Sequence, residues 1–494
     1  MKRIRRQGGS WHHSMMLMWF RTNLPRWQKE RRDMPWYDTE WLAKITGGRW
    51  IRKPLDAIRH VANDTRRISP GALYVALRGA RFDGHAFAAH AFEAGASAAM
   101  IERGAAVALD GEYPLLEVEN TQAALSALGA AHRAQVGPLV IGVTGSAGKT
   151  TVKEMTAAVL SAAGETARTA GNWNNEIGLP LSLLSMEMNV RYGVFEAGMN
   201  HPGEIQRLCE VLRPDWGIVT TVGPVHLEFF DSVEAIAREK SELLRALPAG
   251  GRAFLHRDSA WFPLLRDQSP CVVRTVSLEQ HPEADLWIAL DVAGRRLSAT
   301  AQGEVRTFEW PWPGQHNALN AGFAILVGRE AGLRWEQIQA GLATYQPLPM
   351  RWQEERIAGC LFINDAYNAN PTSMRAALST FATMHGEGRR WLVLGDMLEL
   401  GTTGRDEHAA LGEALAGGGW SGLLTVGPLA AHIAEGAERK GFPGANIWKC
   451  ADTGTAATVL GEQIAEGDAI LLKGSRGVAL ESILALVKNG KGEE

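Results

Sequence analysis

Residues 142–151, Gly-Val-Thr-Gly-Ser-Ala-Gly-Lys-Thr-Thr, are the stretch that decides the fold. The apolar run 139–143 predicts a buried strand, and a helix is expected to begin at Lys149. Glycines at such a strand-to-helix turn let backbone N–H groups approach phosphates closely. The stretch therefore predicts an α/β sheet that binds a nucleotide at the carboxyl end of a strand.

Lys149 and Thr150 are the side chains of this loop that carry chemistry. A lysine here reaches the β- and γ-phosphates, and the hydroxyl after it ligates Mg²⁺. The strict phosphate-loop pattern asks for glycine where this chain has Val143. The loop alone therefore favours nucleotide binding without separating an ATPase, a GTPase or a ligase.

On both sides of the loop, apolar runs alternate with helical patterns, as in parallel sheets with crossover helices. We predict three α/β domains, at 38–120, 121–349 and 350–494. Residues 285–310 alternate polar and apolar side chains, which indicates an antiparallel edge. In the third domain, Asn370 is expected to cap a helix that begins at Pro371.

The first 37 residues differ from the rest in charge. They hold nine Lys/Arg and two Asp/Glu, a net charge of +7. Since the whole chain has a net charge of −3, the remaining residues carry a net charge of −10. The apolar run 15–20 is shorter than a secretory segment (about 7–15 residues) or a membrane span (about 20). We expect a basic, Trp-rich extension that is unstructured or a start assigned too far upstream, with a weak membrane-surface anchor as the functional alternative, and no stable membrane insertion.

The composition of the 494-residue chain is that of an ordinary globular protein, with 46% hydrophobic and 21% charged residues. This excludes disordered and collagen-like classes, and the acidic body argues against a nucleic-acid partner. The four cysteines, Cys209, Cys271, Cys360 and Cys450, form no CxxC pair. They favour reduced thiols in a cytoplasmic protein and exclude zinc fingers and disulfide frameworks.

Further candidates follow other strands. Glu196 ends the apolar run 192–195, where a carboxylate can hold the metal that bridges nucleotide phosphates, or can be a surface residue in a turn. His226 follows the apolar run 216–222 and fits a metal ligand, a general base or a structural histidine. Lys240 lies in a charged helical segment, which by default favours a solvated face.

Amides are dense in 171–178, where Asn172, Asn174 and Asn175 lie within four positions. Amides hydrogen-bond a peptide-like ligand without adding charge, and they are also common turn residues. The segment is therefore a candidate for peptide binding.

These stretches together resemble the Mur ligase family of peptidoglycan synthesis, over about residues 39–488. The family's phosphate loop also lacks the first glycine of the strict pattern. The resemblance is carried by 64–66 with 81–85, 144–151, 171–180, 314–320, 365–374 and 394–401. The segments 171–180, 365–374 and 394–401 are similar to the branch that adds D-alanyl-D-alanine. The Asp-Asn-Pro-Arg motif of the diaminopimelate- or lysine-adding branch is absent.

The resemblance implies a fold and an activity. The first domain would be a small α/β UDP-substrate-binding domain, the second a P-loop ATPase-like parallel sheet, and the third a Rossmann-like doubly wound domain. The enzyme would use ATP and Mg²⁺ to join D-Ala-D-Ala to UDP-MurNAc-tripeptide through an acyl phosphate. UDP-MurNAc-pentapeptide, ADP and phosphate would be the products, and the protein would be a cytoplasmic monomer.

The resemblance also implies residue roles. Asn317 would contact adenine, and Arg351 and Asp365 would reach the γ-phosphate and ribose. Asn364 stands where the family has a first Asp. The phosphate-loop residues would be Gly145, Ser146, Ala147, Gly148, Lys149, Thr150 and Thr151. The metal ligands would be Thr150, Glu196, His226 and Lys240, the last as a carbamate. Substrate binding would use Thr65, Arg66, Arg81, Asp83 and His85 at the UDP end and Asn172 and Asn175 at the tripeptide. The C-terminal part of the site would be lined by Tyr367, Asn368, Asn370, Lys473 and Arg476. In an open arrangement, we expect Arg351 and Asp365 to lie far from Lys149.

Two other functions remain open at this point. One is a different amide ligase of the same family, such as the diaminopimelate- or lysine-adding or the folylpolyglutamate enzyme. The other is a non-catalytic, nucleotide-dependent scaffold, against which the set Lys149, Glu196, His226 and Lys240 argues. ATP turnover that depends on the tripeptide would separate these functions. The third residue of the tripeptide, diaminopimelate or lysine, is left undetermined.

Overall fold

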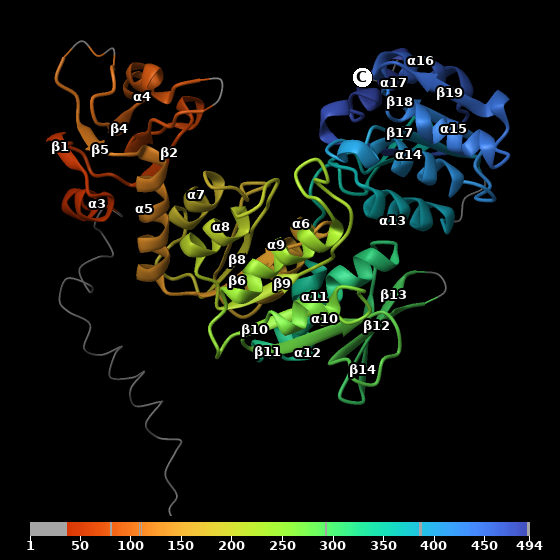
Figure 1. Cartoon of the computed structure of the whole chain (residues 1–494), viewed down its shortest axis with the longest axis horizontal. Helices are drawn as coiled ribbons and strands as arrows, with labels where there is room; N and C mark the ends of the chain where they lie inside the picture. Colours follow the sequence, from red (N-terminus) through yellow and green to blue (C-terminus); the bar gives the residue numbers. More distant parts are fainter. Residues whose placement is uncertain are drawn as a thin grey trace, which may run out of the picture. The chain divides into compact units, whose positions relative to one another are not determined.

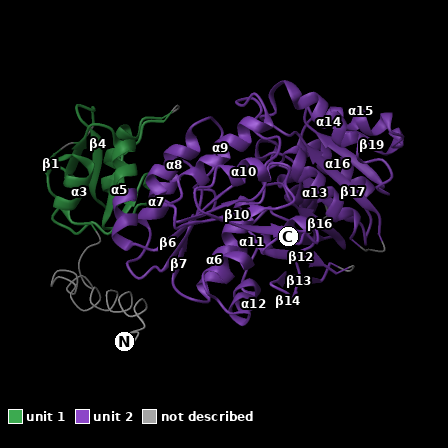
Figure 2. Ribbon diagram, turned by 60° about the horizontal axis from the view of Figure 1, so that its bottom comes forward, with its two compact units in different colours: residues 1–128 green, residues 129–494 purple. Residues whose placement is uncertain are grey.

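The computed structural model describes residues 37–79, 82–107, 109, 111–291, 294–384 and 388–491. The N-terminal extension up to residue 36 and Arg81 lie outside this range. The chain forms two compact units, residues up to Leu128 and Gly129–Glu494 (Figure 2). Within the described residues no helix is both long and apolar enough to cross a membrane. The boundaries of the three predicted domains stay predictions, but each of the three sheets lies within one predicted range.

The first unit is built on a five-stranded sheet of order β1-β5-β4-β3-β2. All neighbours are parallel except β1 and β5. The strands are β1 (Arg49–Arg52), β2 (His60–Ala62), β3 (Ala72–Val75), β4 (Ala96–Glu102) and β5 (Leu115–Val118). The helices are α3 (Thr39–Thr46), η2 (Thr65–Arg67), η3 (Gly84–Phe87) and α4 (Ala88–Glu93), and the boundary at Leu128 falls within α5 (Thr121–Val136) (Figure 1).

The second unit begins with a nine-stranded sheet of order β14-β13-β12-β11-β10-β9-β6-β8-β7. Its strands are β6 (Leu139–Thr144), β7 (Thr166–Arg168), β8 (Tyr192–Glu196), β9 (Trp216–Val219), β10 (Arg252–His256), β11 (Val272–Ser277), β12 (Leu286–Leu290), β13 (Arg296–Ala301) and β14 (Glu304–Glu309). Its helices are α6 (Lys149–Ser161), α7 (Gly178–Leu184), α8 (Glu204–Leu212), α9 (Val233–Arg245), α10 (Phe262–Asp267), α11 (Gln315–Glu330) and α12 (Trp335–Ala343). The strands from β7 to β12 are parallel, whereas β12, β13 and β14 pair antiparallel. The predicted antiparallel edge at 285–310 is therefore confirmed.

Helices cover both faces of this sheet around β6. Val140 belongs to a core shared with α7, α8 and α9, whereas Ile141 and Val143 pack in a second core with α6, α11 and α12. Neighbouring residues of a strand point to opposite faces, so β6 is apolar at nearly every position. This explains why Val143 replaces the glycine of the strict motif: its side chain is fully buried in the strand.

The same unit contains a six-stranded sheet of order β15-β16-β20-β17-β18-β19, parallel except for β15. Its strands are β15 (Gln353–Ile357), β16 (Cys360–Asn364), β17 (Arg390–Gly395), β18 (Gly422–Val426), β19 (Ile447–Cys450) and β20 (Ala469–Lys473). The helices are α13 (Pro371–Ala382), η4 (Gly401–Thr403), α14 (Gly404–Glu413), α15 (Ala431–Arg439), η5 (Gly444–Asn446), α16 (Thr453–Gln463), η6 (Arg476–Val478) and α17 (Ser482–Lys491). The predicted cap is confirmed, because Asn370 Oδ1 accepts a 2.9 Å hydrogen bond from Ser373 N.

The predicted strand 216–222 is three residues too long, because β9 ends at Val219. Thr220 and Thr221 leave the sheet and bind the phosphate loop instead: Thr220 Oγ1 donates to Ala147 O at 2.5 Å, and Ser146 N donates to Thr221 O at 2.8 Å.

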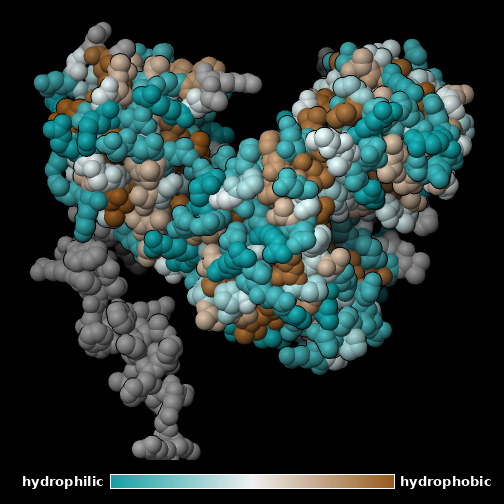
Figure 3. Space-filling view, viewed as in Figure 1, coloured by the Kyte–Doolittle hydropathy of each residue, from teal (hydrophilic) through white to brown (hydrophobic). Residues whose placement is uncertain are grey.

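On the face of the molecule in Figure 3, brown apolar residues are scattered among polar ones.

The packing of α14 on α15 depends on glycine. A Cβ at Gly412 would lie 1.9 Å from Ile433 O of α15, whereas a Cβ at Gly461 of α16 has nothing within 4 Å. We expect Gly412→Ala to lower the free energy of unfolding by about 3 kcal/mol, since the helices must separate. Gly461→Ala should leave it unchanged or raise it by up to about 1 kcal/mol, because alanine favours the helix. Urea unfolding of both variants checks this, and equal destabilisation would contradict it.

Candidate active site

The loop between β6 and α6 needs glycine at two positions. Gly145 has φ of 152°, and a Cβ there would lie 1.9 Å from Thr220 Oγ1. Gly148 has φ of 82°, and its Cβ would lie 2.6 Å from Asn320 Oδ1. The loop is therefore packed against other segments by its backbone, and the N-terminal N–H groups of α6 face the same region.

Lys149 begins α6 and folds back over the loop, where its Nζ donates to Gly145 O at 2.8 Å. Burial lowers the pKa of Lys149, the Glu196 carboxylate acts in the opposite direction, and Arg351 lowers it again. An ammonium held among backbone oxygen and a nearby carboxylate is placed to bind an anion such as a phosphate.

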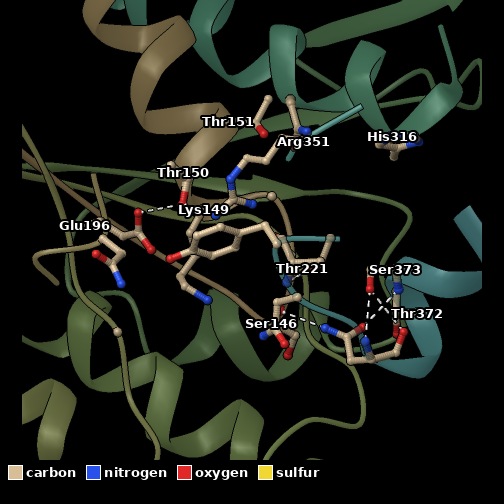
Figure 4. A pocket seen from close by; sticks show the side chains of 18 of the residues that line it. Ser146, Lys149, Thr150, Thr151, Glu196, Thr221, His316, Arg351, Thr372 and Ser373 are labelled. Atoms are coloured by element: carbon tan, nitrogen blue, oxygen red, sulfur yellow. Dashed lines mark hydrogen bonds between the residues drawn. The ribbon is translucent and has the colours of Figure 1, made fainter. Parts of the chain in front are cut away.

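Thr150 and Glu196 form the centre of a hydrogen-bonded chain (Figure 4). Thr150 Oγ1 donates to Glu196 Oε2 at 2.9 Å, and Asn174 Nδ2 donates to Glu196 Oε1 at 2.8 Å. Glu196 is only 2% exposed, so the possibility of a surface turn residue is excluded. A buried carboxylate beside a hydroxyl at the end of β8 is a fitting pair of oxygen ligands for Mg²⁺.

Arg351 reaches this centre from the segment before β15. Its Nη2 donates to Thr150 Oγ1 at 2.9 Å, and its guanidinium lies 4.1 Å from the centre of the Tyr367 ring. The expectation that Arg351 lies far from Lys149 is wrong for this structure, because Arg351 contacts the residue next to Lys149. Asp365 lines the same cavity and accepts a 2.6 Å hydrogen bond from Lys473 Nζ.

His226 contacts a loop of the six-stranded sheet. Its Nδ1 lies 2.6 Å from Glu399 Oε2, in the loop after β17. The hydrogen bond from His226 is the largest cause that lowers the pKa of the Glu399 carboxyl. Glu399 is therefore an anion at neutral pH beside the imidazole.

Lys240 does not lie on a solvated face, which corrects the default expectation. Its side chain is 1% exposed, because α9 buries the stripe formed by Ile236, Lys240, Leu243 and Leu244. Burial lowers the pKa of Lys240 well below its ordinary value, the Lys149 charge adds to this effect, and Glu239 opposes it. Burial and the nearby Lys149 charge thus both disfavour the charged form of this amine.

A cavity of about 490 Å³ gathers most of the residues predicted for the site. Those that line it are Ser146, Ala147, Gly148, Lys149, Thr150, Thr151, Asn172, Asn175, Glu196, His226, Asn317, Arg351, Asp365, Tyr367, Asn368, Asn370 and Lys473. Gly145, Lys240 and Arg476 do not line it. Arg476 pairs with Glu481 and lies 3.1 Å from Met350 Sδ, next to Arg351, so its predicted place at the C-terminal side of the site stays a prediction.

The cavity also contains residues that the sequence analysis missed. Trp312 and Tyr345 pack edge to face with ring centres 4.8 Å apart, and His316 and Asn320 project from α11. The place of Asn320 in the site could have been predicted from the sequence. It lies within 314–320 and three residues after Asn317, which places both on the same side of a helix. No local pattern marks the two aromatic residues.

The UDP-end residues belong to the first unit. Asp64 Oδ2 accepts from Arg66 Nη2 at 2.8 Å, and this pairing lowers the pKa of Asp64 to about 2. Thr65 begins η2 after Asp64. Asp83 Oδ1 lies 2.5 Å from His85 Nδ1, and His85 Nε2 accepts from Glu102 N at 2.9 Å. These contacts order two turns that expose polar groups.

Comparisons with known proteins identify the family of this chain. Models of the Mur ligase family match at residues 57–158 (catalytic domain), 143–328 (middle domain) and 350–476 (glutamate ligase domain). The UDP-N-acetylmuramoyl-tripeptide–D-alanyl-D-alanine ligase of Escherichia coli is 38% identical over 444 residues, which are 87% of this chain and 94% of the relative. The chain belongs to the Mur ligase family.

Solved structures show how far this Mur ligase resembles its relatives. A crystal structure of MurF from Acinetobacter baumannii has a TM-score of 0.82 at 30% identity, covering 92% of this chain and 99% of that one. MurF of Thermotoga maritima in complex with ADP has a TM-score of 0.75 at 28% identity, covering 87% and 97%. The three-domain α/β fold expected from the sequence is thereby confirmed for this Mur ligase.

His316 gives this Mur ligase a pH-dependent stability. Burial lowers the pKa of His316 to about 4, with Asp365 raising it and Lys473 lowering it further. Between pH 6.5 and 4 the unfolded histidine takes up a proton and the folded one does not, so stability falls as the pH falls through this window. We expect His316→Gln to remove about 2 kcal/mol of the loss between pH 7 and 4.5. Urea unfolding across this range checks it, and parallel profiles for both proteins would refute it.

Proposed function

We propose that the chain joins D-alanyl-D-alanine to UDP-MurNAc-tripeptide with ATP, forming UDP-MurNAc-pentapeptide, ADP and phosphate in cytoplasmic peptidoglycan precursor synthesis. The observation that carries this proposal is the meeting of Lys149, Thr150, Glu196 and Arg351 in one cavity lined by Asn172 and Asn175. Cations and a metal-type oxygen pair suit phosphate transfer, and neutral amides suit a peptide. The printed names of the most similar relatives support the specific substrates.

The residues around Glu196 fit Mg²⁺. The oxygens of Thr150 and Glu196, the imidazole of His226 and a carbamate on Lys240 would hold the ion, and all but Lys240 line the cavity. When bound, Mg²⁺ neutralises charge on the nucleotide phosphates. The guanidinium of Arg351 donates a hydrogen bond to the Thr150 hydroxyl, which is one of the proposed metal ligands. The guanidinium would therefore move from Thr150 to the γ-phosphate when the nucleotide binds.

The chemistry that we propose has two steps. In the first, an oxygen of the tripeptide's terminal carboxylate attacks the γ-phosphorus of ATP, an acyl phosphate forms and ADP leaves. Lys149 and Arg351 would stabilise the negative charge on the transferring group from two sides. The position of Lys149 costs little reorganisation during the reaction, since its Nζ is already held by the hydrogen bond to Gly145 O.

In the second step the amine of D-Ala-D-Ala attacks the acyl carbon, a tetrahedral intermediate forms and phosphate leaves. The amine must first lose its proton, and the tripeptide must present its carbonyl. Asn172 and Asn175 would orient the tripeptide from the segment before α7. Asn175 has a fixed backbone role too, because its Oδ1 accepts from Gly178 N at 2.8 Å.

Other parts of the site follow the family pattern. Asn317 would contact the adenine, with Asp365, Tyr367, Asn368, Asn370 and Lys473 lining the side of the site that belongs to the six-stranded sheet. In the first unit, Thr65, Arg66, Asp83 and His85 would bind the UDP group. We propose a monomer, since the site needs no second copy for any of these roles.

ADP release with ATP and UDP-MurNAc-tripeptide, with and without D-Ala-D-Ala, tests the proposal. We expect dipeptide-dependent turnover and a UDP-linked pentapeptide by mass spectrometry, with diaminopimelate- and lysine-containing tripeptides compared side by side. Turnover only with a UDP-dipeptide and a diamino acid would place the enzyme in another branch. Nucleotide binding without turnover would favour the scaffold.

A further inference from the structure

Two segments that are far apart in the chain meet beside the cavity. The residues 226–228 follow β9, and 399–401 follow β17. His226 Nδ1 lies 2.6 Å from Glu399 Oε2, and Glu228 N donates to Glu399 O at 3.2 Å. A Cβ at Gly401 would lie 3.1 Å from Glu228 Cα, so the two backbones touch. The contact is therefore made by backbone and side chains together.

Both partners of the side-chain contact hold an unusual backbone. His226 has φ of 53° and Glu399 has φ of 63°, a region that residues with a side chain rarely adopt. Such conformations persist where the surrounding structure holds them, and they cluster at functional sites. Here the two left-handed residues direct their side chains at each other.

The loop that carries Glu399 is anchored along its length. Asp396 Oδ1 accepts from Ala430 N at 2.6 Å, and Met397 N donates to His408 Nε2 at 2.8 Å. Leu398 N donates to Ser475 Oγ at 2.9 Å. Three separate elements thus hold the three residues before Glu399, and the carboxylate is presented on a rigid support rather than on a free side chain.

We propose that Glu399 is a positioning residue that fixes the tautomer and the orientation of His226 for a divalent cation. This inference rests on the proposed function, because it takes His226 as a ligand of the nucleotide-bound metal. Glu399 contacts only the histidine among the proposed ligands, so it acts through His226 and does not touch the reacting atoms.

The hydrogen bond determines which ring nitrogen is available. A carboxylate that faces Nδ1 accepts a hydrogen bond from Nδ1–H, so in the neutral ring the proton stays on Nδ1 and Nε2 keeps its lone pair. Metal-bound histidines usually donate their other N–H to a carboxylate in this way, which also fixes the plane of the ring. Because Glu399 comes from the loop after β17, this metal ligand is complete only when that loop contacts the residues after β9.

Metal affinity of the full chain tests the proposal. We expect Glu399→Ala to raise the Kd for Mn²⁺, measured by electron paramagnetic resonance with a non-hydrolysable ATP analogue, about tenfold or more. The Mg²⁺ concentration for half-maximal ADP release should rise in parallel. Glu399→Gln should have a smaller effect, since an amide oxygen still accepts from Nδ1–H but carries no charge.

Glu228→Ala is the matched control. It removes an exposed carboxylate from the same contact and keeps the backbone N–H that bonds to Glu399, so both metal constants should stay at the wild-type value. Unchanged metal constants in Glu399→Ala, or lower activity at unchanged Mn²⁺ affinity, would overturn the proposal. Should Glu399→Ala not fold, as judged by its thermal transition, Glu399→Gln decides. Absent turnover in the wild type would refute the proposed function alone, because the Mn²⁺ comparison does not need it.

Discussion

Lys149→Met should lower dipeptide-dependent ADP release by about 10³-fold, the largest effect expected from a single substitution in this chain. Lys149 Nζ is held 2.8 Å from Gly145 O at the start of α6, and methionine keeps the length of the side chain but removes its charge. Charge that develops on the transferring phosphoryl group would then lack its nearest cation. Steady-state ADP release at saturating ATP measures the loss.

Lys449→Met serves as its control, because Lys449 lies on β19 with its side chain 46% exposed and paired only loosely with Glu438, at 3.8 Å. It should retain wild-type turnover. Nucleotide affinity gives a second check. Lys149→Met should lose less in ADP affinity than in turnover rate, since the lysine acts most on the transition state. A Lys149→Met enzyme within tenfold of the wild-type rate would contradict the assigned role.

Lys240→Ala should lower turnover by about 10²-fold or more, and added bicarbonate should not restore it. Lys240 is buried, and burial together with the Lys149 charge lowers its pKa, so its amine can react with CO₂ to form a carbamate. The reaction forms an N–C bond, releases a proton and turns a cation site into an oxygen ligand. Wild-type activity should fall in CO₂-free buffer and recover with bicarbonate.

Lys240→Arg separates this role from simple positive charge, because arginine cannot form the carbamate and should be inactive as well. ¹³C-labelled bicarbonate should give a carbamate signal by NMR in the wild type and none in Lys240→Arg. Glu242→Gln, two residues along α9 in a partly exposed pair with Arg245, should behave as the wild type. Full activity in Lys240→Ala would exclude the carbamate.

Local sequence patterns predicted much of the fold. The phosphate loop, the strands β6, β8, β16, β17, β18 and β20 and the cap at Asn370 follow from apolar runs, glycines and turn chemistry, which act within a few residues. The predicted end of β9 was wrong because the strand stops before Thr220, whose hydroxyl donates a hydrogen bond to a residue 73 positions earlier in the chain. Contacts at that separation leave no mark on a hydrophobic pattern.

The site was predictable to a smaller degree, for the same reason. The burial of Lys240 was predictable, since helical spacing places it on the same face as the apolar residues Ile236 and Leu243. Glu399 and His226 are 173 residues apart, and only the fold brings them together. The contact of Arg351 with Thr150 likewise joins segments 201 residues apart, which no motif spacing encodes.

The two edges of the nine-stranded sheet bear on how the protein behaves at high concentration. An edge strand offers unpaired backbone groups to which another molecule can add its own strand. At one edge, β14 exposes Glu304, Arg306 and Glu309, and charges there repel an incoming strand. At the other, β7 is only three residues long and ends in Arg168. The charges on β14 and the short length of β7 therefore both oppose the addition of a strand from another molecule.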